Sequence, residues 1–136
     1  MRSLSEIKEI IEKLARPINP PAEAMPTYDN FIYDGTPNIE VSTSVYYYRA
    51  FAERGEVVKN QQTDNLAELL YWVFRDIADR IAYNFAMQYR NPSEDFRRVW
   101  FEHQLELLEK VKIEWKIQRE KEIEEILANA PYNDTK

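Results

Sequence analysis

This chain of 136 residues contains no cysteine, and it has only two glycines and one histidine. The lack of cysteine excludes disulfides, thiolate nucleophiles and cysteine-based zinc sites. No stretch approaches the ~20 apolar residues that are needed to span a bilayer, and no apolar signal segment follows Met1. We therefore predict a cytoplasmic location.

Basic residues are outnumbered, with 18 Lys and Arg against 24 Asp and Glu, which gives a net charge of −6. Nucleic acids and anionic membranes are bound through basic side chains that neutralise phosphates, so we expect neither as a partner. The negative charge would instead attract a basic protein and steer it toward the chain. A charge of this size is also ordinary for a small domain, so by itself it predicts only solubility.

The length fits one domain, and the 44% of hydrophobic residues can supply its core. We expect a single domain over 1–136, with an N-terminal helix in 1–16, an acidic β-rich part in 17–62 and a helical part in 63–130. Ser3 and Glu6 have the spacing of a capping box at the start of the first helix, and Pro17 ends it.

The segment 17–48 holds four acidic residues, five prolines and no Lys or Arg. A short strand is predicted over 28–33, and strict alternation from Ile39 to Phe51 predicts one longer strand. On that strand, odd-numbered residues would form the apolar row and Tyr46 and Tyr48 would lie on the opposite face. Glu53-Arg54-Gly55 predicts a hairpin turn, followed by a returning strand over 57–61.

Three helices are predicted after the sheet. Asp64 is the expected cap of a helix that reaches about Arg90, Ser93 the expected cap of the next, and 114–129 forms the last. The fold class is therefore α+β, with a small antiparallel sheet of three to four strands packed against about four helices. The C-terminal half is all helical.

Groups that support catalysis are few. His103 lies between Val99 and Leu107 on the apolar side of its helix, which is typical of a structural histidine, and no carboxylate precedes it by three or four residues to form a metal pair. No glycine-rich phosphate loop, nucleophile elbow or H-E-x-x-H motif is present. We expect no enzyme activity, cofactor or metal, and we expect Arg97 and Arg98 to bridge to Asp76 or Asp79.

Aromatic and acidic residues of the β-rich part are the candidate contacts for a partner. Tyr is enriched at interface hot spots because it buries a large rigid surface and keeps one polar group. Tyr46 and Tyr48 would serve in this way unless a helix covers their face of the sheet, and that alternative stays open. The full candidate set is Tyr28, Asp29, Tyr33, Asp34, Glu40, Tyr46 and Tyr48.

The order of several motifs resembles the immunity protein 63 family of bacterial polymorphic toxin systems. These motifs are Tyr46-Tyr47-Tyr48, Glu53-Arg54-Gly55, Leu69-Leu70-Tyr71-Trp72-Val73-Phe74 with Asp76, Asp95-Phe96-Arg97-Arg98, Gln104-Leu105-Glu106-Leu107-Leu108 and Trp115. The likeness runs from about Val45 to Leu127. The family often has a histidine where this chain has Tyr47, and a proline before the tryptophan where this chain has Lys112-Ile113-Glu114. The first forty residues fall outside the likeness.

The resemblance implies a protein that binds the toxin encoded beside it and blocks it, and the acidic charge would suit a basic nuclease effector. Two other readings stay open. The chain could be a structural or regulatory protein that forms a homodimer through 114–129. It could also be a carboxylate-based hydrolase, which would require a cleft with two facing acids.

Overall fold

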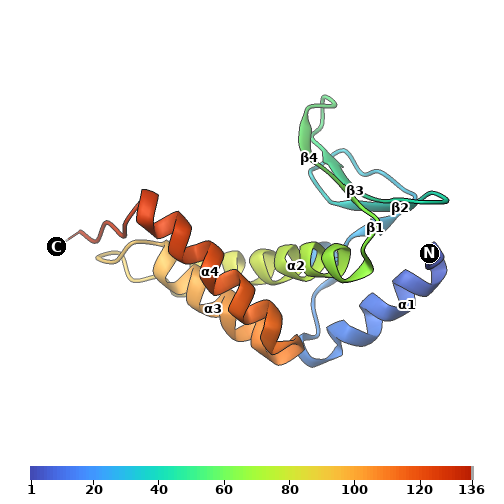
Figure 1. The fold of residues 1–136 in the computed structure, drawn as a ribbon. Coiled ribbons are helices and arrows are strands. Elements are labelled where there is room, and N and C mark those ends of the chain that lie inside the picture. Colours follow the sequence, from blue (N-terminus) through green and yellow to red (C-terminus); the bar gives the residue numbers. More distant parts are fainter. Residues whose placement is uncertain (136) are drawn as a thin grey trace. The chain divides into compact units, whose positions relative to one another are not determined.

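The computed structural model describes residues 1–135, which form two compact units, residues 1–73 and 74–135. The first unit holds helix α1 (Leu4–Ala15), a four-stranded sheet and the start of helix α2 (Leu66–Tyr89). The second holds the rest of α2 with α3 (Arg97–Val111) and α4 (Ile113–Asn129) (Figure 1). The predicted α+β class with a helical C-terminal half is confirmed. The single-domain assignment stays a prediction.

Helix α1 begins at the predicted capping box. The Ser3 hydroxyl accepts from the Glu6 N–H at 3.2 Å, and the Glu6 carboxylate accepts from the Ser3 N–H at 3.1 Å. Two donors that lack a partner inside the helix are thereby satisfied. Ile7 and Ile11 are fully buried, and the helix passes into a short 3-10 turn, Arg16–Ile18, at the proline.

The sheet has the order β1 (Thr27–Tyr28), β2 (Asn38–Val41), β3 (Tyr46–Phe51) and β4 (Val57–Thr63). It is mixed and not antiparallel throughout as predicted, because β1 pairs in parallel with β2 while the other pairs are antiparallel. The strand predicted over 28–33 ends at Tyr28. Asp29 takes a left-handed backbone with a φ of 49°, and the Asn30 N–H donates to the Asn38 side chain instead of continuing a ladder.

The single strand predicted from Ile39 to Phe51 is wrong. A turn at Ser42–Val45 divides it into β2 and β3, with the Ser42 N–H donating to the Val45 carbonyl at 2.9 Å. The two strands pair with Val41 opposite Tyr46. Directly paired residues share a face, so even-numbered residues of β3 lie with odd-numbered residues of β2. The predicted inward and outward faces of β3 are therefore exchanged.

The second hairpin turn is confirmed. The Gly55 N–H donates to the Ala52 carbonyl at 2.9 Å, the Ala52 N–H donates to the Glu56 carbonyl at 2.8 Å, and Gly55 has a φ of 83°. This conformation strains any residue with a Cβ, so glycine is required at the turn. The returning strand β4 extends to Thr63, two residues beyond its predicted end.

Both later helix starts differ from prediction. The side chain that caps α2 is Asn65, which accepts from the Glu68 N–H at 3.2 Å, and not Asp64. Helix α3 begins at Arg97 and not directly after Ser93, whose hydroxyl donates to Asn91 Oδ1 at 2.8 Å. The side chain that accepts from the first turn of α3 is Asp95, which accepts from the Arg97 N–H at 2.9 Å.

In the second unit, a buried polar side chain joins three helices. Gln104 on α3 donates through Nε2 to the Arg75 carbonyl on α2 and accepts at Oε1 from Arg119 on α4, both at 3.1 Å. Phe74 of α2 and Trp115 of α4 stack with ring centres 5.2 Å apart. Lys112, which has an extended backbone, separates α3 from α4, and the two helices lie side by side (Figure 1). No helix in 1–135 is long and apolar enough to cross a membrane.

Candidate functional site

The face of the sheet that bears Tyr47, Arg49 and Phe51 is named the outer sheet face. These three residues are half-buried and alternate along β3 with buried Tyr46, Tyr48 and Ala50. Glu40 on β2 pairs directly with Tyr47 and so joins the same face. On β4 the exposed residues Asn60 and Gln62 are opposite Arg49 and Tyr47, which extends the face to the sheet edge.

Three aromatic rings gather at one end of the outer sheet face and are named the aromatic cluster. The ring centres of Phe31 and Phe51 are 5.2 Å apart, and Tyr33 lies 6.3 Å from Phe31 and 6.2 Å from Phe51. The Tyr33 side chain is 54% exposed, and its neighbour Ile32 is exposed as well. Clustered aromatic rings that stay open to solvent are typical of surfaces that bind a partner.

Arg49 links the cluster to the rest of the outer sheet face. Its guanidinium lies 5.6 Å from the centre of the Phe31 ring and 4.9 Å from that of Tyr47. The same group forms a hydrogen-bonded ion pair with Glu40. Stacking and pairing hold the arginine in one orientation, and the partial burial of both charged groups reduces screening by water. The surface is therefore ordered before any partner arrives.

Two of the predicted acidic contacts lie on the loop that follows β1. Asp34 accepts from both the backbone N–H and the hydroxyl of Thr36, at 2.9 and 2.6 Å, so its carboxylate stabilises its own turn. Asp29 is exposed, and its backbone N–H donates to the Ile39 carbonyl at 3.1 Å. The structure thus brings Tyr33 and Glu40 onto the outer sheet face, while the Asp34 carboxylate supports the loop that carries Tyr33.

Tyr28 belongs to the opposite side of the sheet. It pairs with buried Ile39, and the Lys8 ammonium of α1 lies 5.6 Å from its ring centre. The Tyr28 hydroxyl is buried without a hydrogen-bond partner. Burial, together with the charge of Glu12, raises the pKa of Tyr28 to about 12.

Tyr46 and Tyr48 are only 2% and 1% exposed, so the prediction that they line a contact surface is corrected. The Tyr46 hydroxyl accepts from the Arg2 N–H at 2.9 Å, and the Tyr48 ring stacks on Trp72 of α2 with centres 6.3 Å apart. Their face is covered, which was the alternative left open. Both tyrosines stabilise the unit that carries the outer sheet face.

Sequence reasoning missed Phe31, Tyr47, Arg49 and Phe51. Tyr47 and Phe51 were assigned to the inward row because one continuous strand was assumed. Arg49 was a usable signal, since a charged residue in the middle of an aromatic strand marks the face that meets solvent. Phe31 carried no such signal, because its contacts with Phe51 and Arg49 of β3 join residues far apart in the sequence.

Arg97 and Arg98 bind the C-terminal tail, which corrects their predicted pairing with Asp76 or Asp79. Arg97 pairs with Asp95 at 2.8 Å and donates to the Ala130 and Pro131 carbonyls at 2.8 and 2.9 Å. Arg98 pairs with Asp134 at 2.9 Å. Both guanidinium groups lie over the Tyr132 ring, at 5.5 and 4.1 Å.

His103 and Asp79 lie in surroundings that are typical of residues with a structural role. His103 stacks on Phe85 with ring centres 4.0 Å apart, and its Nδ1 lies 3.5 Å from Glu106. Burial, with a smaller effect of Asp76, raises the pKa of Asp79, and Trp100 and two arginines offset part of that rise. Within residues 1–135, no group of three His, Asp or Glu side chains could hold a metal ion.

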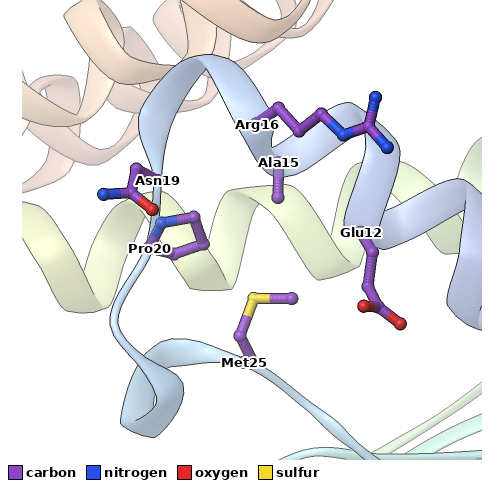
Figure 2. Close-up of a pocket in the computed structure, with 6 residues that line it drawn as sticks. All are labelled: Glu12, Ala15, Arg16, Asn19, Pro20 and Met25. Carbon is purple, nitrogen blue, oxygen red and sulfur yellow. The ribbon is translucent and has the colours of Figure 1, made fainter.

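A small depression of about 190 Å³ lies at the end of α1. Figure 2 shows the Met25 side chain extending toward Ala15, with Glu12 and Arg16 on the helix above it and Asn19 and Pro20 beside it. Sites for small organic ligands enclose roughly 300–1,000 Å³ and bury most of the ligand. This depression is smaller and open, so the outer sheet face is the better candidate for function.

Comparison with known proteins places the chain in a family. A family model described as immunity protein 63 matches residues 43–125. The match covers β3, β4, α2, α3 and most of α4, and agrees with the resemblance found from Val45 to Leu127. Tyr47, Arg49 and Phe51 lie within it, whereas Phe31 and Tyr33 precede it. No curated protein matches the chain, and no solved structure does.

Proposed function

The chain belongs to the immunity protein 63 family, and from this premise we propose that it binds a cognate bacterial toxin and neutralises it by forming a stoichiometric complex. Such a mechanism needs a contact surface and no catalytic group of its own. It would act in the cytoplasm of the cell that makes the toxin, where the toxin must be blocked.

The outer sheet face is the surface that we assign to toxin binding. Its aromatic cluster carries the proposal, because Tyr33 is more than half exposed while its ring packs against Phe31 and Phe51. An aromatic side chain already held by its neighbours loses little conformational freedom on binding. Arg49, fixed between Glu40 and two rings, adds a residue type enriched at hot spots. Tyr28, Tyr46 and Tyr48 are not part of the proposed contact.

The charge of the chain favours a basic toxin, and a nuclease is the class we propose. The acidic segment 17–48 holds four acids and no basic residue, and it leads into the outer sheet face. Asp29 is its clearest steering charge, because it is exposed, whereas Glu40 is paired with Arg49. Opposite charges across an interface raise the association rate more than they lower the dissociation rate.

A neutralisation titration tests the proposal. The toxin domain encoded by the gene next to that of this chain would be purified and assayed with increasing amounts of the chain. Toxin activity should fall linearly and reach its floor at one chain per toxin. A chain that leaves activity unchanged in molar excess, or that lowers it at far below equimolar amounts by turnover, would refute the proposal.

Charge reversal tests the steering step separately. Asp29→Lys should lower the association rate constant at low ionic strength and have little effect at high salt, because exposed charges are screened. Asp34→Lys is a poor probe, since Asp34 holds its own turn through Thr36. Glu125→Lys, at an exposed acid on α4, is the matched control. Equal slowing by Asp29→Lys and Glu125→Lys would assign the effect to net charge alone.

A further inference from the structure

Strand β4 forms a free edge of the sheet. The strand order places β3 on one side of β4, and no strand within residues 1–135 pairs with its other side. In an antiparallel pair, the backbone N–H and C=O groups of alternate residues point away from the partner strand. The seven residues of β4 therefore present unpaired backbone groups, which are a template for another strand.

This edge has few of the features that protect edges from pairing. It contains no proline, and Lys59 is its one charged residue. Val57 and Val58 are exposed at its first end, where the pairing with β3 is shifted at Ala50/Phe51. The residues after that shift form an uninterrupted ladder with β3. Charges, prolines and bulges are the usual means of blocking association through an edge.

We propose that β4 pairs with the β4 strand of a second copy of the chain, antiparallel and about a two-fold axis at Asn60. A two-fold axis makes each contact occur twice and places the axial residue opposite itself. In this register Asn60 faces Asn60 of the second copy, and Lys59 faces Gln61. The two four-stranded sheets then become one continuous sheet.

The side chains of β4 suit this register. Lys59 and Gln61 lie on the same face, because they pair with Ala50 and Tyr48, the inward-facing residues of β3. Gln61 Oε1 is a buried acceptor without a hydrogen-bond partner. The Lys59 ammonium lies 5.9 Å from the centre of the Tyr48 ring in its own chain, and the pairing places it opposite Gln61 of the second copy, twice per dimer. Two copies of net charge −6 repel, and β4 is a stretch without any acid where they can approach.

The last helix is a weaker surface for self-association. Four of its charged residues form ion pairs within the helix, Lys116 with Glu120 at 3.2 Å and Arg119 with Glu122 at 3.0 Å. Its exposed large apolar residues are Ile113 and Ile117 near its start and Ile126 near its end, with charged residues between them. An apolar stripe along the whole helix, which a helix pair would need, is missing.

Two substitutions of the same charge test the register. Sedimentation equilibrium of the full chain should show a reversible dimer. Asn60→Asp places two carboxylates opposite each other and should raise the dimer dissociation constant about five-fold or more. Gln61→Glu creates two Lys59–Glu pairs and should lower that constant about two- to thirty-fold. Net repulsion alone would make both substitutions weaken the dimer. Ser44→Asp, in the exposed turn before β3, is the control and should have a far smaller effect.

A wild-type chain that stays monomeric at high concentration would overturn the proposal, as would weakening of the dimer by both acidic substitutions. If the wild type is monomeric, the second-copy proposal fails whatever the effect of Asn60→Asp on toxin binding, because Asn60 also lies on the outer sheet face. Circular dichroism checks folding, and Asn60→Lys, which also places like charges at the axis, replaces Asn60→Asp if that variant unfolds. Toxin neutralisation is measured in a separate titration, so the absence of a dimer would not contradict the proposed function.

Discussion

The backbone N–H of Arg2 donates to the hydroxyl of Tyr46, 44 residues further along the chain, at 2.9 Å. This bond attaches β3 to the residue before the capping box of α1. Because the Tyr46 side chain is buried, it stabilises the first unit and is closed to a partner. The outer sheet face depends on such contacts behind it for its shape.

Tyr46→Phe should therefore lower the free energy of unfolding by about 1 kcal/mol, the usual net value of one hydrogen bond. Its affinity for the toxin should match that of the wild type. Urea unfolding followed by circular dichroism gives the first quantity, and calorimetric titration gives the second. A variant of normal stability that binds the toxin poorly would return Tyr46 to the contact surface.

Tyr28→Phe should have the opposite effect on stability and raise the free energy of unfolding by about 1 kcal/mol, because it removes a buried hydroxyl that has no partner. The pKa of Tyr28 is raised to about 12 in the folded state, from an ordinary value of 10. Between these values the unfolded state loses a proton that the folded state keeps, so wild-type stability falls as pH rises through this window. Unfolding at pH 8 and pH 11 should show a smaller loss in Tyr28→Phe. Equal losses would contradict the burial of this hydroxyl.

Tyr33→Ala should weaken toxin binding at least ~10-fold, as expected for a hot-spot aromatic, with little change in stability. Tyr89→Ala is a matched control, because Tyr89 is 60% exposed on α2 and also has an aromatic neighbour, Phe85, at 4.7 Å. Surface plasmon resonance of both variants against the toxin domain separates the two surfaces. A large loss in Tyr89→Ala with none in Tyr33→Ala would move the binding surface to the second unit.

The C-terminal tail should resist acid. Hydrogen bonds from Arg97 and from the backbone of Asn133 hold the pKa of Asp95 well below its ordinary value of 3.8. Because the pKa of Asp95 is lowered in the folded state, the tail should stay attached above pH 3.8. The attachment should be lost only as pH falls through the lowered pKa. The amide NMR signal of Asn133 should therefore move only below pH 3.8, and Asp95→Asn should abolish that titration. Movement centred above pH 3.8 in the wild type would show that the tail is not held by this carboxylate.

Local sequence patterns predicted the helices and the second hairpin turn, whereas non-local contacts determine which face of β3 is buried. Ser3 with Glu6, and Gly55 in its turn, were readable from sequence because each involves residues within four positions. The orientation of β3 was not readable, since it follows from Val41 being opposite Tyr46 across a turn that alternation conceals. A single shift of register exchanges the two faces of a strand.

The tail contacts and the aromatic cluster escaped prediction for a related reason. Arg97 donates to carbonyls 33 and 34 residues away, whereas the sequence suggested Asp76 and Asp79 on the preceding helix as partners. Phe31, in the loop after β1, contacts Phe51 at the end of β3. Sequence spacing does not encode distances of this kind, whereas composition alone located the acidic segment that leads into the site.

Hydrogen exchange of the chain, alone and with the toxin domain, measures the central claim most directly. The account predicts that binding slows amide exchange in peptides covering residues 31–33 and 46–51, which hold Tyr33 and the outer-face residues of β3, and leaves α3 and α4 unchanged. Protection confined to residues 97–129, with free exchange in the loop that carries Tyr33, would contradict it.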